Sequence, residues 1–212
     1  MVQTVAITEA ITTLDQVIER LGLQRSEDPE FFPEWQQAHP SVGSTQQIEL
    51  EQLRRRYLYH RSAGQLLEET VKLLMVGPLL GVAGFYDPPF LVRAEESIQL
   101  TCTDGEEILK GRIDAIVVRD DLWVIVVESK KTMLSVWAAL PQALAYLMAN
   151  PQSHQPAYGL ITNGDEMVFV KLLPAPVPTY NLSRVFSPYV AASELEQVVG
   201  ILQQLSRSLI EN

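Results

Sequence analysis

Cysteine is almost absent from this sequence, which contains one, Cys102, in 212 residues. A single cysteine excludes an internal disulfide framework and a cysteine-rich zinc site, and it favours a reducing compartment such as the cytoplasm. Histidine is nearly as scarce. His39, His60 and His154 are scattered along the chain, without the spacing of a zinc site or a histidine-based triad. We therefore expect neither disulfide nor zinc chemistry.

Basic residues and long apolar runs are also scarce. Sixteen Lys and Arg oppose 26 Asp and Glu, which gives a net charge of −10. This balance argues against a large exposed basic surface of the kind that binds nucleic acid unaided. The N-terminus has early acidic residues, no basic region and no long apolar run, so it predicts neither a signal peptide nor a membrane span. We expect a cytoplasmic protein without membrane contact.

The overall composition is that of a globular protein. Hydrophobic residues make up 47% of the chain and charged residues 20%, a balance that supports folding rather than disorder. A chain of 212 residues can bury one sizeable core and carry a small helical appendage. We predict a helical extension and linker over residues 1–60, followed by a main domain with a C-terminal helix over residues 61–212.

Hydrophobic periodicity predicts several helices. Pro141 must lie in the first turns of one of them or kink it. The predicted helical ranges are 8–21, which stops at Gly22; 48–80, as two consecutive helices or one bent helix; 133–150; and 193–210. Residues 23–46 are rich in Pro and polar groups and predict a long connection, anchored to the body by Phe31, Phe32 and Trp35.

Between these helices lie two groups of predicted strands. Residues 97–102, 111–118 and 122–129 predict an antiparallel meander with short polar turns. Residues 157–162 and 166–173 predict two more strands, joined by the strong hairpin turn Asn163-Gly164-Asp165.

Asp114, Glu128 and Lys130 are charged residues set among the apolar residues of two of these strands. If the strands pair through a short turn centred on Asp121, the three share one face, because side chains alternate along a strand. The same register pairs Asp114 with Glu128, Ile116 with Val126, and Val118 with Val124. The charged trio then lies at the far end of an otherwise apolar face.

Two facing carboxylates repel one another, and burial penalises each, so a nearby cation is implied. Mg²⁺ prefers carboxylate oxygens together with water and phosphate. Lys130 could orient an attacking water and stabilise developing phosphate charge, which is the chemistry of phosphodiester hydrolysis. The alternative is that Asp114 and Glu128 lie near wet strand ends and form ordinary ion pairs with Lys130 or Arg112.

The sequence resembles the PD-(D/E)xK nuclease superfamily, and more closely the restriction-endonuclease-like nuclease domain of type I restriction enzyme R subunits. The resemblance covers about residues 64–173 and lies in the order helix, three strands, helix, strand. "GRIDAIVV" supplies the Asp, "VVESKK" the Glu-x-Lys, and "QALAY" the Gln-x-x-x-Tyr motif. It implies that Asp114 and Glu128 are metal ligands and that Lys130 is the catalytic lysine. Gln142 and Tyr146 would be the DNA-contacting and site-shaping pair.

The helix before the first strand often supplies a further glutamate in such proteins. "LEETVKLLMVGPLL" resembles that helix, and its spacing favours Glu68 as a metal ligand, with Glu69 as the alternate. The fold implied by the resemblance is an α/β, restriction-endonuclease-like αβββαβ core, with a mixed central sheet flanked by helices and an N-terminal helical extension. Because no helicase motor follows, the resemblance implies a nuclease that stands alone, like short cyanobacterial-type proteins.

The function implied is a Mg²⁺- or Mn²⁺-dependent, restriction-type endonuclease that hydrolyses DNA phosphodiester bonds. It would act as a homodimer or with a restriction-system partner that compensates for the acidic net charge. The alternative is a non-catalytic scaffold or subunit with a nuclease-like fold in a larger complex. The basic run of residues 54–56 favours a solvated helix face, with a DNA-contact patch as the less favoured interpretation.

Overall fold

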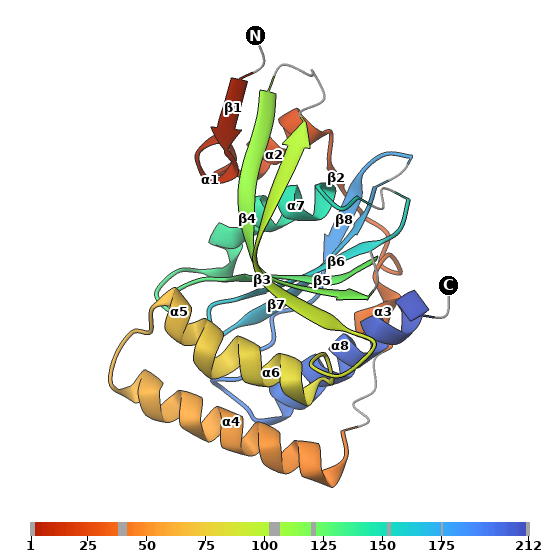
Figure 1. The fold of residues 1–212 in the computed structure, drawn as a ribbon. Helices are drawn as coiled ribbons and strands as arrows, with labels where there is room; N and C mark the ends of the chain where they lie inside the picture. Colours follow the sequence, from red (N-terminus) through yellow and green to blue (C-terminus); the bar gives the residue numbers. More distant parts are fainter. Residues whose placement is uncertain are drawn as a thin grey trace.

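The computed structural model describes residues 3–37, 42–101, 107–119, 122–151, 154–174 and 176–210. Cys102, His39 and the predicted turn around Asp121 lie outside these ranges. The described chain forms a mixed α/β fold around one eight-stranded sheet (Figure 1), which confirms the predicted class and central sheet. None of the described helices is both long and apolar enough to cross a bilayer.

The elements follow one another along the described chain as labelled in Figure 1. The strands are β1 (Gln3–Ala6), β2 (Gln24–Arg25), β3 (Leu91–Thr101), β4 (Glu107–Arg119), β5 (Leu122–Ser129), β6 (Ala157–Thr162), β7 (Met167–Leu173) and β8 (Thr179–Leu182). The helices are α1 (Ile7–Ala10), α2 (Leu14–Leu21), α3 (Pro33–Gln36), α4 (Ser44–Ser62), α5 (Glu68–Val71), α6 (Gly77–Val82), α7 (Leu140–Met148) and α8 (Ser193–Ile210). A π-helical segment, η1 (Lys72–Val76), joins α5 to α6, and a 3₁₀ turn, η2 (Val136–Ala139), precedes α7.

The sheet runs in the order β1, β4, β5, β6, β7, β8, β2, and β3 pairs with β4 beside this path. β3 occupies one edge of β4 from Ile108 to Val118. The other edge is shared, because β1 pairs in parallel with residues 107–110 and β5 pairs antiparallel with residues 115–119. Residues 111–114 therefore face a gap between two strands, and this gap positions the candidate site.

Two hydrophobic cores cover the two faces of the sheet. Side chains of α4, the α5–α6 segment and α8 pack on one face with Leu160 and Phe169. Side chains of α1, α2 and α7 pack on the other face with Ile161 and Val168. Neighbouring residues on β6 and β7 point to opposite cores, as the period of two along a strand requires. The molecule thus has helices, sheet and helices in three layers (Figure 1).

The predicted strands are confirmed with differences at their ends. The pairing of Ile116 with Val126 is present, but Val118 lies opposite Trp123 instead of Val124. The prediction fails there because a β-bulge between Val117 and Val118 shifts the register. β3 begins six residues before the predicted position 97. β1, β2 and β8 were not predicted, because strands of two to four residues carry little periodicity.

The predicted helices also form, with different breaks. The stripe over residues 8–21 splits at Thr13, whose side chain accepts a hydrogen bond from Gln16 N–H and caps α2. Gly22 ends α2 in the left-handed region (φ 65°), as its position predicted. Residues 48–80 fall on two helical segments, α4 and the continuous α5–η1–α6. Pro141 lies in the first turn of α7, where its missing N–H does no harm.

The division at residue 60 stays a prediction. In the structure, residues on both sides of it contribute to one sheet and to both cores. Phe32 is buried against Tyr158, with ring centroids 6.0 Å apart, and Phe31 and Trp35 are partly buried against the same core. The predicted aromatic anchoring of the 23–46 connection is therefore confirmed.

The basic run at 54–56 has at least one structural member. Arg54 donates hydrogen bonds to the backbone oxygens of Pro188, Tyr189 and Val190, at 2.7, 2.9 and 3.3 Å. These bonds fasten α4 to the segment before α8. Arg54 therefore has a structural role in docking α4.

Tyr57 links α4 to the hairpin between β6 and β7. Its hydroxyl donates to Asp165 Oδ1 at 2.7 Å, and Arg61 pairs with the same carboxylate at 3.0 Å. Gly164 has φ 87°, and a Cβ there would lie 2.4 Å from the Tyr57 hydroxyl oxygen. Glycine is therefore required both by the turn and by the close approach of Tyr57.

A buried ion pair fixes the 23–46 connection to the sheet. Lys171 Nζ on β7 lies 2.7 and 2.9 Å from the two carboxylate oxygens of Glu34 on α3. The same carboxylate accepts a hydrogen bond from the Tyr158 hydroxyl at 2.7 Å. Removing one member of such a pair leaves an uncompensated buried charge, which is far more costly than removing both.

We expect Lys171→Met to lower the free energy of unfolding by about 3–5 kcal/mol, as measured by urea denaturation at pH 7. The double replacement Glu34→Leu with Lys171→Met should recover most of this loss. The more exposed pair of Arg20 and Glu107 provides a control, and Arg20→Met should cost about 1 kcal/mol or less. Equal losses in the two single variants would contradict the assignment of a buried, stabilising pair.

Candidate functional site

Asp114 lies on β4 at the end of the gap between β1 and β5. Tyr146 of α7 closes this gap, since its buried hydroxyl is hydrogen bonded to the backbone of Arg112. Gly111 makes the approach possible. A Cβ at Gly111 would lie 2.7 Å from Tyr146 Cε1 and 2.9 Å from Ile7 Cδ1, closer than any side chain tolerates. The "GRID" sequence therefore combines a glycine that admits Tyr146 with an aspartate at the open edge.

The alternation of side chains along β4 is interrupted at Asp114. Ile113 and Ile116 belong to the same core although they are three residues apart. Opposite this point on β3, Glu95 has φ 57°, in the left-handed region, and the β3–β4 pairing passes over Glu95 and Asp114 without a change of register. A non-glycine residue in this region is strained, and such strain gathers at functional sites. The predicted single face containing both Asp114 and Ile116 is therefore not continuous.

Glu128 and Lys130 end β5 beside Asp114. The last pair of the β4–β5 ladder is Ala115 with Val127, so Asp114 and Glu128 occupy the next positions on the two strands. Glu128 is only 3% exposed. Its Oε1 is 2.6 Å from Lys130 Nζ, whereas its Oε2 is buried without a hydrogen-bond partner among the described residues.

Burial raises the pKa of the Glu128 carboxyl to about 7. Lys130 opposes this rise, and the negative charges of Asp114 and Glu68 add to it. Burial by itself would lower the pKa of Lys130, but attraction to Glu128 and the hydrogen bond with it raise that pKa overall. The two groups thus stabilise each other's charges within a dry environment.

Lys72, the first residue of η1, supplies a second ammonium to the site. Its Nζ lies 2.8 Å from Asp114 Oδ1 and 3.4 Å from Glu95 Oε1. It also lies 3.0 Å from Glu69 Oε1 and 3.7 Å from Glu68 Oε1. Burial opposes the charge of Lys72, but hydrogen bonds to Asp114 and Glu69 raise its pKa overall. Glu68, Glu95, Asp114 and Glu128 are called the carboxylate cluster below.

Glu68 and Glu69 occupy different places at the start of α5. Glu69 is 80% exposed, and its contact is with Lys72 at the outer side. Glu68 is half as exposed, and its charge acts on Glu128, Lys130 and Tyr146. The geometry therefore places Glu68 nearer the site than Glu69, although its role as a ligand stays a prediction.

The two residues of the predicted motif on α7, Gln142 and Tyr146, lie in different environments. Tyr146 is buried, and burial together with the charges of Glu128 and Asp114 raises the pKa of its hydroxyl. Gln142 lies one turn earlier and is partly exposed. Among the hydrogen bonds of the described residues, none joins Gln142 to the carboxylate cluster. Tyr146 is thus positioned to shape the site, and contact of Gln142 with DNA stays a prediction.

The donor types of the carboxylate cluster suit a hard divalent cation. Carboxylate oxygens are the ligands that Mg²⁺ prefers, and Glu128 Oε2 is a buried carboxylate oxygen without a partner among the described residues. Within the same residues, however, no three Asp, Glu, His or Cys side chains are grouped closely enough to hold a metal ion. The chemistry of the ligands fits, whereas the Lys72 ammonium contacts Asp114, Glu95 and Glu68 in the present arrangement.

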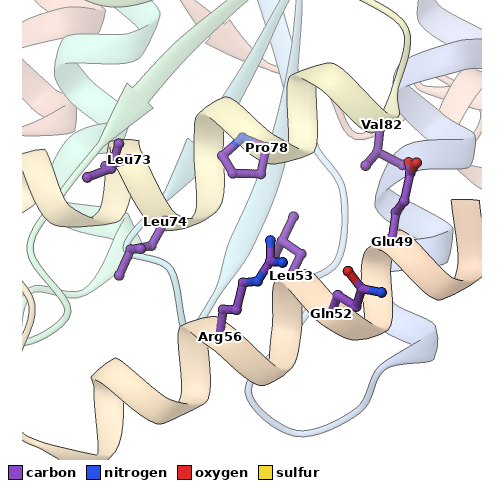
Figure 2. A pocket seen from close by; sticks show the side chains of 8 residues that line it. All are labelled: Glu49, Gln52, Leu53, Arg56, Leu73, Leu74, Pro78 and Val82. Carbon is purple, nitrogen blue, oxygen red and sulfur yellow. The ribbon is translucent and has the colours of Figure 1, made fainter.

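A separate groove lies between α4 and the η1–α6 segment (Figure 2). It has a volume of about 380 Å³ and contains none of the predicted site residues. Its lining combines apolar side chains with the polar side chains of Glu49, Gln52 and Arg56. The lining residues are Glu49, Gln52, Leu53, Arg56, Leu73, Leu74, Pro78 and Val82.

Sequence reasoning missed two members of the site, Lys72 and Glu95. Lys72 follows Glu68 by four residues, and this spacing on a helix could have indicated a pair on one face. Its contact with Asp114 depends on how the helix packs on the sheet, which no local pattern encodes. Glu95 carried no signal, because a positive φ is usual for Gly, Asn or Asp.

No protein-family model matches the sequence, and no curated protein matches it. Among solved structures, it is similar to a fragment assigned as an HsdR subunit of a type I restriction enzyme from Vibrio vulnificus YJ016, with 20% identity and a TM-score of 0.41. The match covers 65% of this chain and 26% of that chain. These values do not establish a shared family, so membership of the PD-(D/E)xK superfamily stays a prediction.

The pKa of Glu128 predicts a pH-dependent stability. Between about pH 4.5 and pH 7 the folded protein keeps a proton that the unfolded chain has released, so stability should fall as the pH rises through this window. A rise from 4.5 to about 7 corresponds to a loss on the order of 3 kcal/mol. Glu128→Gln removes this titration. Urea denaturation in chelator at pH 4.5 to 8 should show the wild type losing stability relative to the variant, and a constant difference would refute the assignment.

Proposed function

We propose that this protein is an endonuclease that hydrolyses DNA phosphodiester bonds with the help of Mg²⁺ or Mn²⁺. The observation that carries the proposal is the buried Glu128 carboxylate, which has one oxygen bonded to Lys130 and one oxygen without a partner among the described residues. Asp114 occupies the next position on the neighbouring strand. A buried carboxylate of raised pKa beside a second carboxylate and an ammonium is an arrangement typical of functional sites.

Each residue has a role in this proposal. Asp114 and Glu128 would hold the divalent ion, and Glu68 could add a third carboxylate from α5. The ion, when bound, supplies Lewis acidity for phosphodiester hydrolysis. Lys130 Nζ, held at 2.6 Å from Glu128, would present positive charge to the phosphate oxygens as their charge grows. Tyr146 would fix the β4 backbone beside Asp114, and Gln142 would contact the DNA from the exposed side of α7.

Binding of DNA requires an answer to the acidic net charge of −10. Phosphate contacts by Lys and Arg supply most of the affinity of proteins for DNA. A second copy of the chain or a restriction-system partner would supply part of this charge. The proposal therefore includes activity that depends on protein concentration or on a partner.

A non-catalytic scaffold is the second candidate, and Lys72 is the observation that favours it. Its ammonium contacts Asp114, Glu68 and Glu95, so these carboxylates have a counter-charge without any metal. In a scaffold this arrangement would be the final state of the site, and the protein would bind neither Mg²⁺ nor Mn²⁺. Metal binding thus separates the two candidates.

Asp114→Ala tests the proposed function. We expect the wild type to bind Mg²⁺ or Mn²⁺ in calorimetric titrations and to nick supercoiled plasmid. The variant should lose metal binding and lower nicking by more than about 100-fold, because it removes a carboxylate from the proposed metal site. The exposed Asp87, replaced by Ala, serves as a matched control that should retain both properties.

The two assays together identify the failure. Metal binding without nicking in the wild type would point to a missing partner or substrate. Absence of metal binding, with and without DNA, would remove the catalytic proposal and leave the scaffold. Nicking that survives in Asp114→Ala would place the activity elsewhere or in a contaminant.

A further inference from the structure

Lys72 connects the helical segment α5–η1 with the carboxylates of β3 and β4. Its Nζ contacts carboxylates from three elements, at 2.8 Å from Asp114 on β4, 3.4 Å from Glu95 on β3 and 3.7 Å from Glu68 on α5. The side chain is largely buried. A single ammonium thus serves carboxylates from three elements that would otherwise repel one another.

The local backbone is unusual where this contact is made. Lys72 begins η1, a π-helical segment of five residues inside an otherwise α-helical run. Such segments are rare and often occur at functional sites. Glu95, which Lys72 also contacts, is the residue whose φ lies in the left-handed region. Both partners of the Lys72–Glu95 ion pair therefore lie where the backbone departs from regular structure.

Glu128 gives an independent indication that this cluster accommodates a ligand. The residue is 3% exposed, and its Oε2 is buried without a partner among the described residues. The charges of Asp114 and Glu68 both act on Glu128, so the three carboxylates belong to one electrostatic environment. Lys72 neutralises the Asp114 side of that environment, and Lys130 neutralises the Glu128 Oε1 side.

We propose that Lys72 is an internal counter-ion that neutralises Asp114 in the metal-free protein and gives up this contact when the divalent cation binds. This inference rests on the proposed function and adds a positioning residue to it. Without metal, the ammonium prevents repulsion within the carboxylate cluster and keeps the site assembled. With metal, the cation takes over this role, and Lys72 keeps its contacts with the more exposed Glu69 and Glu95.

The proposal predicts competition between Lys72 and the metal. An ammonium at 2.8 Å from Asp114 Oδ1 and a divalent ion bound to the same carboxylate would repel each other strongly at such short range. Part of the binding free energy of the metal is then consumed in displacing Lys72. Removing the ammonium should therefore strengthen metal binding while it weakens the metal-free protein.

Lys72→Met tests this competition without relying on nuclease activity. Calorimetric titration with Mn²⁺ should show affinity about tenfold higher than in the wild type, a coupling within the usual range for two linked ligands. Thermal unfolding should show the variant less stable than the wild type in chelator. Saturating Mn²⁺ should raise its midpoint of unfolding by more than it raises that of the wild type.

Two further variants control for charge and for folding. Arg112→Met removes one positive charge close to the cluster, where Arg112 pairs with Glu95 at 3.0 Å and is 65% exposed. A general effect of charge would strengthen metal binding equally in Arg112→Met and Lys72→Met, whereas competition predicts a much larger effect in Lys72→Met. Lys72→Arg retains the positive charge and should keep the affinity close to that of the wild type.

The outcomes separate this inference from the proposed function. If the wild type binds Mn²⁺ and Lys72→Met binds it no more tightly, the counter-ion role is wrong and the nuclease proposal stands. If none of these proteins binds metal, both fail and the scaffold remains. If Lys72→Met does not fold, reductive ¹³C-methylation of the wild type decides. The Lys72 signal, assigned with Lys72→Arg, should shift on addition of Mg²⁺, and an unchanged signal in a Mg²⁺-bound protein would overturn the inference.

Discussion

The open stretch on the edge of β4 is the constraint from which the site follows. β1 pairs with β4 as far as Lys110, and the pairing of β5 with β4 begins at Ala115. On this edge, the residues between these two positions must be covered by something other than a strand. Tyr146 does this with its ring against Gly111 and its hydroxyl on the Arg112 backbone. A backbone group left unpaired in a dry interior is costly. Asp114 lies beside the same gap, next to the last residue pair of the β4–β5 ladder, and its carboxylate reaches Lys72 of η1.

Electrostatics then determines which groups can accompany Asp114. Glu128 is buried and close to another carboxylate, and both conditions disfavour its charged form. Lys130 offsets only part of this penalty, so the pKa of Glu128 remains raised. Lys72 balances the opposite side of the cluster. In such a site a small change in the position of one ammonium alters the charge state of the rest. The fold therefore keeps the carboxylates close together but does not fully offset the cost of charging Glu128.

Local patterns predicted the parts of the fold that depend on neighbouring residues. The alternation in β4 and β5, the Asn163-Gly164-Asp165 turn and the apolar stripe of α8 each carry their own signal. The register failed only beyond Val117, where a bulge inserts a residue that the pattern does not mark. Asp114, Glu128 and Lys130 were predicted as site residues because charges within apolar strands stand out. The contact of Lys72 with Asp114 depends instead on how a helix packs over the sheet. Periodicity carries no information about such a relation between distant segments.

The bond between Tyr57 and Asp165 bears on how modular this protein is. α4 lies outside the order of helix, three strands, helix and strand, yet Tyr57 and Arg61 hold the turn after β6. Thr162, at the end of β6, accepts a hydrogen bond from the Lys130 N–H at 2.8 Å. The backbone at Lys130 is thus steadied, through one turn, by a helix far upstream in the sequence. Residues 64–173 transplanted alone would carry every motif side chain but would lack the helix that holds the turn beside the Lys130 backbone.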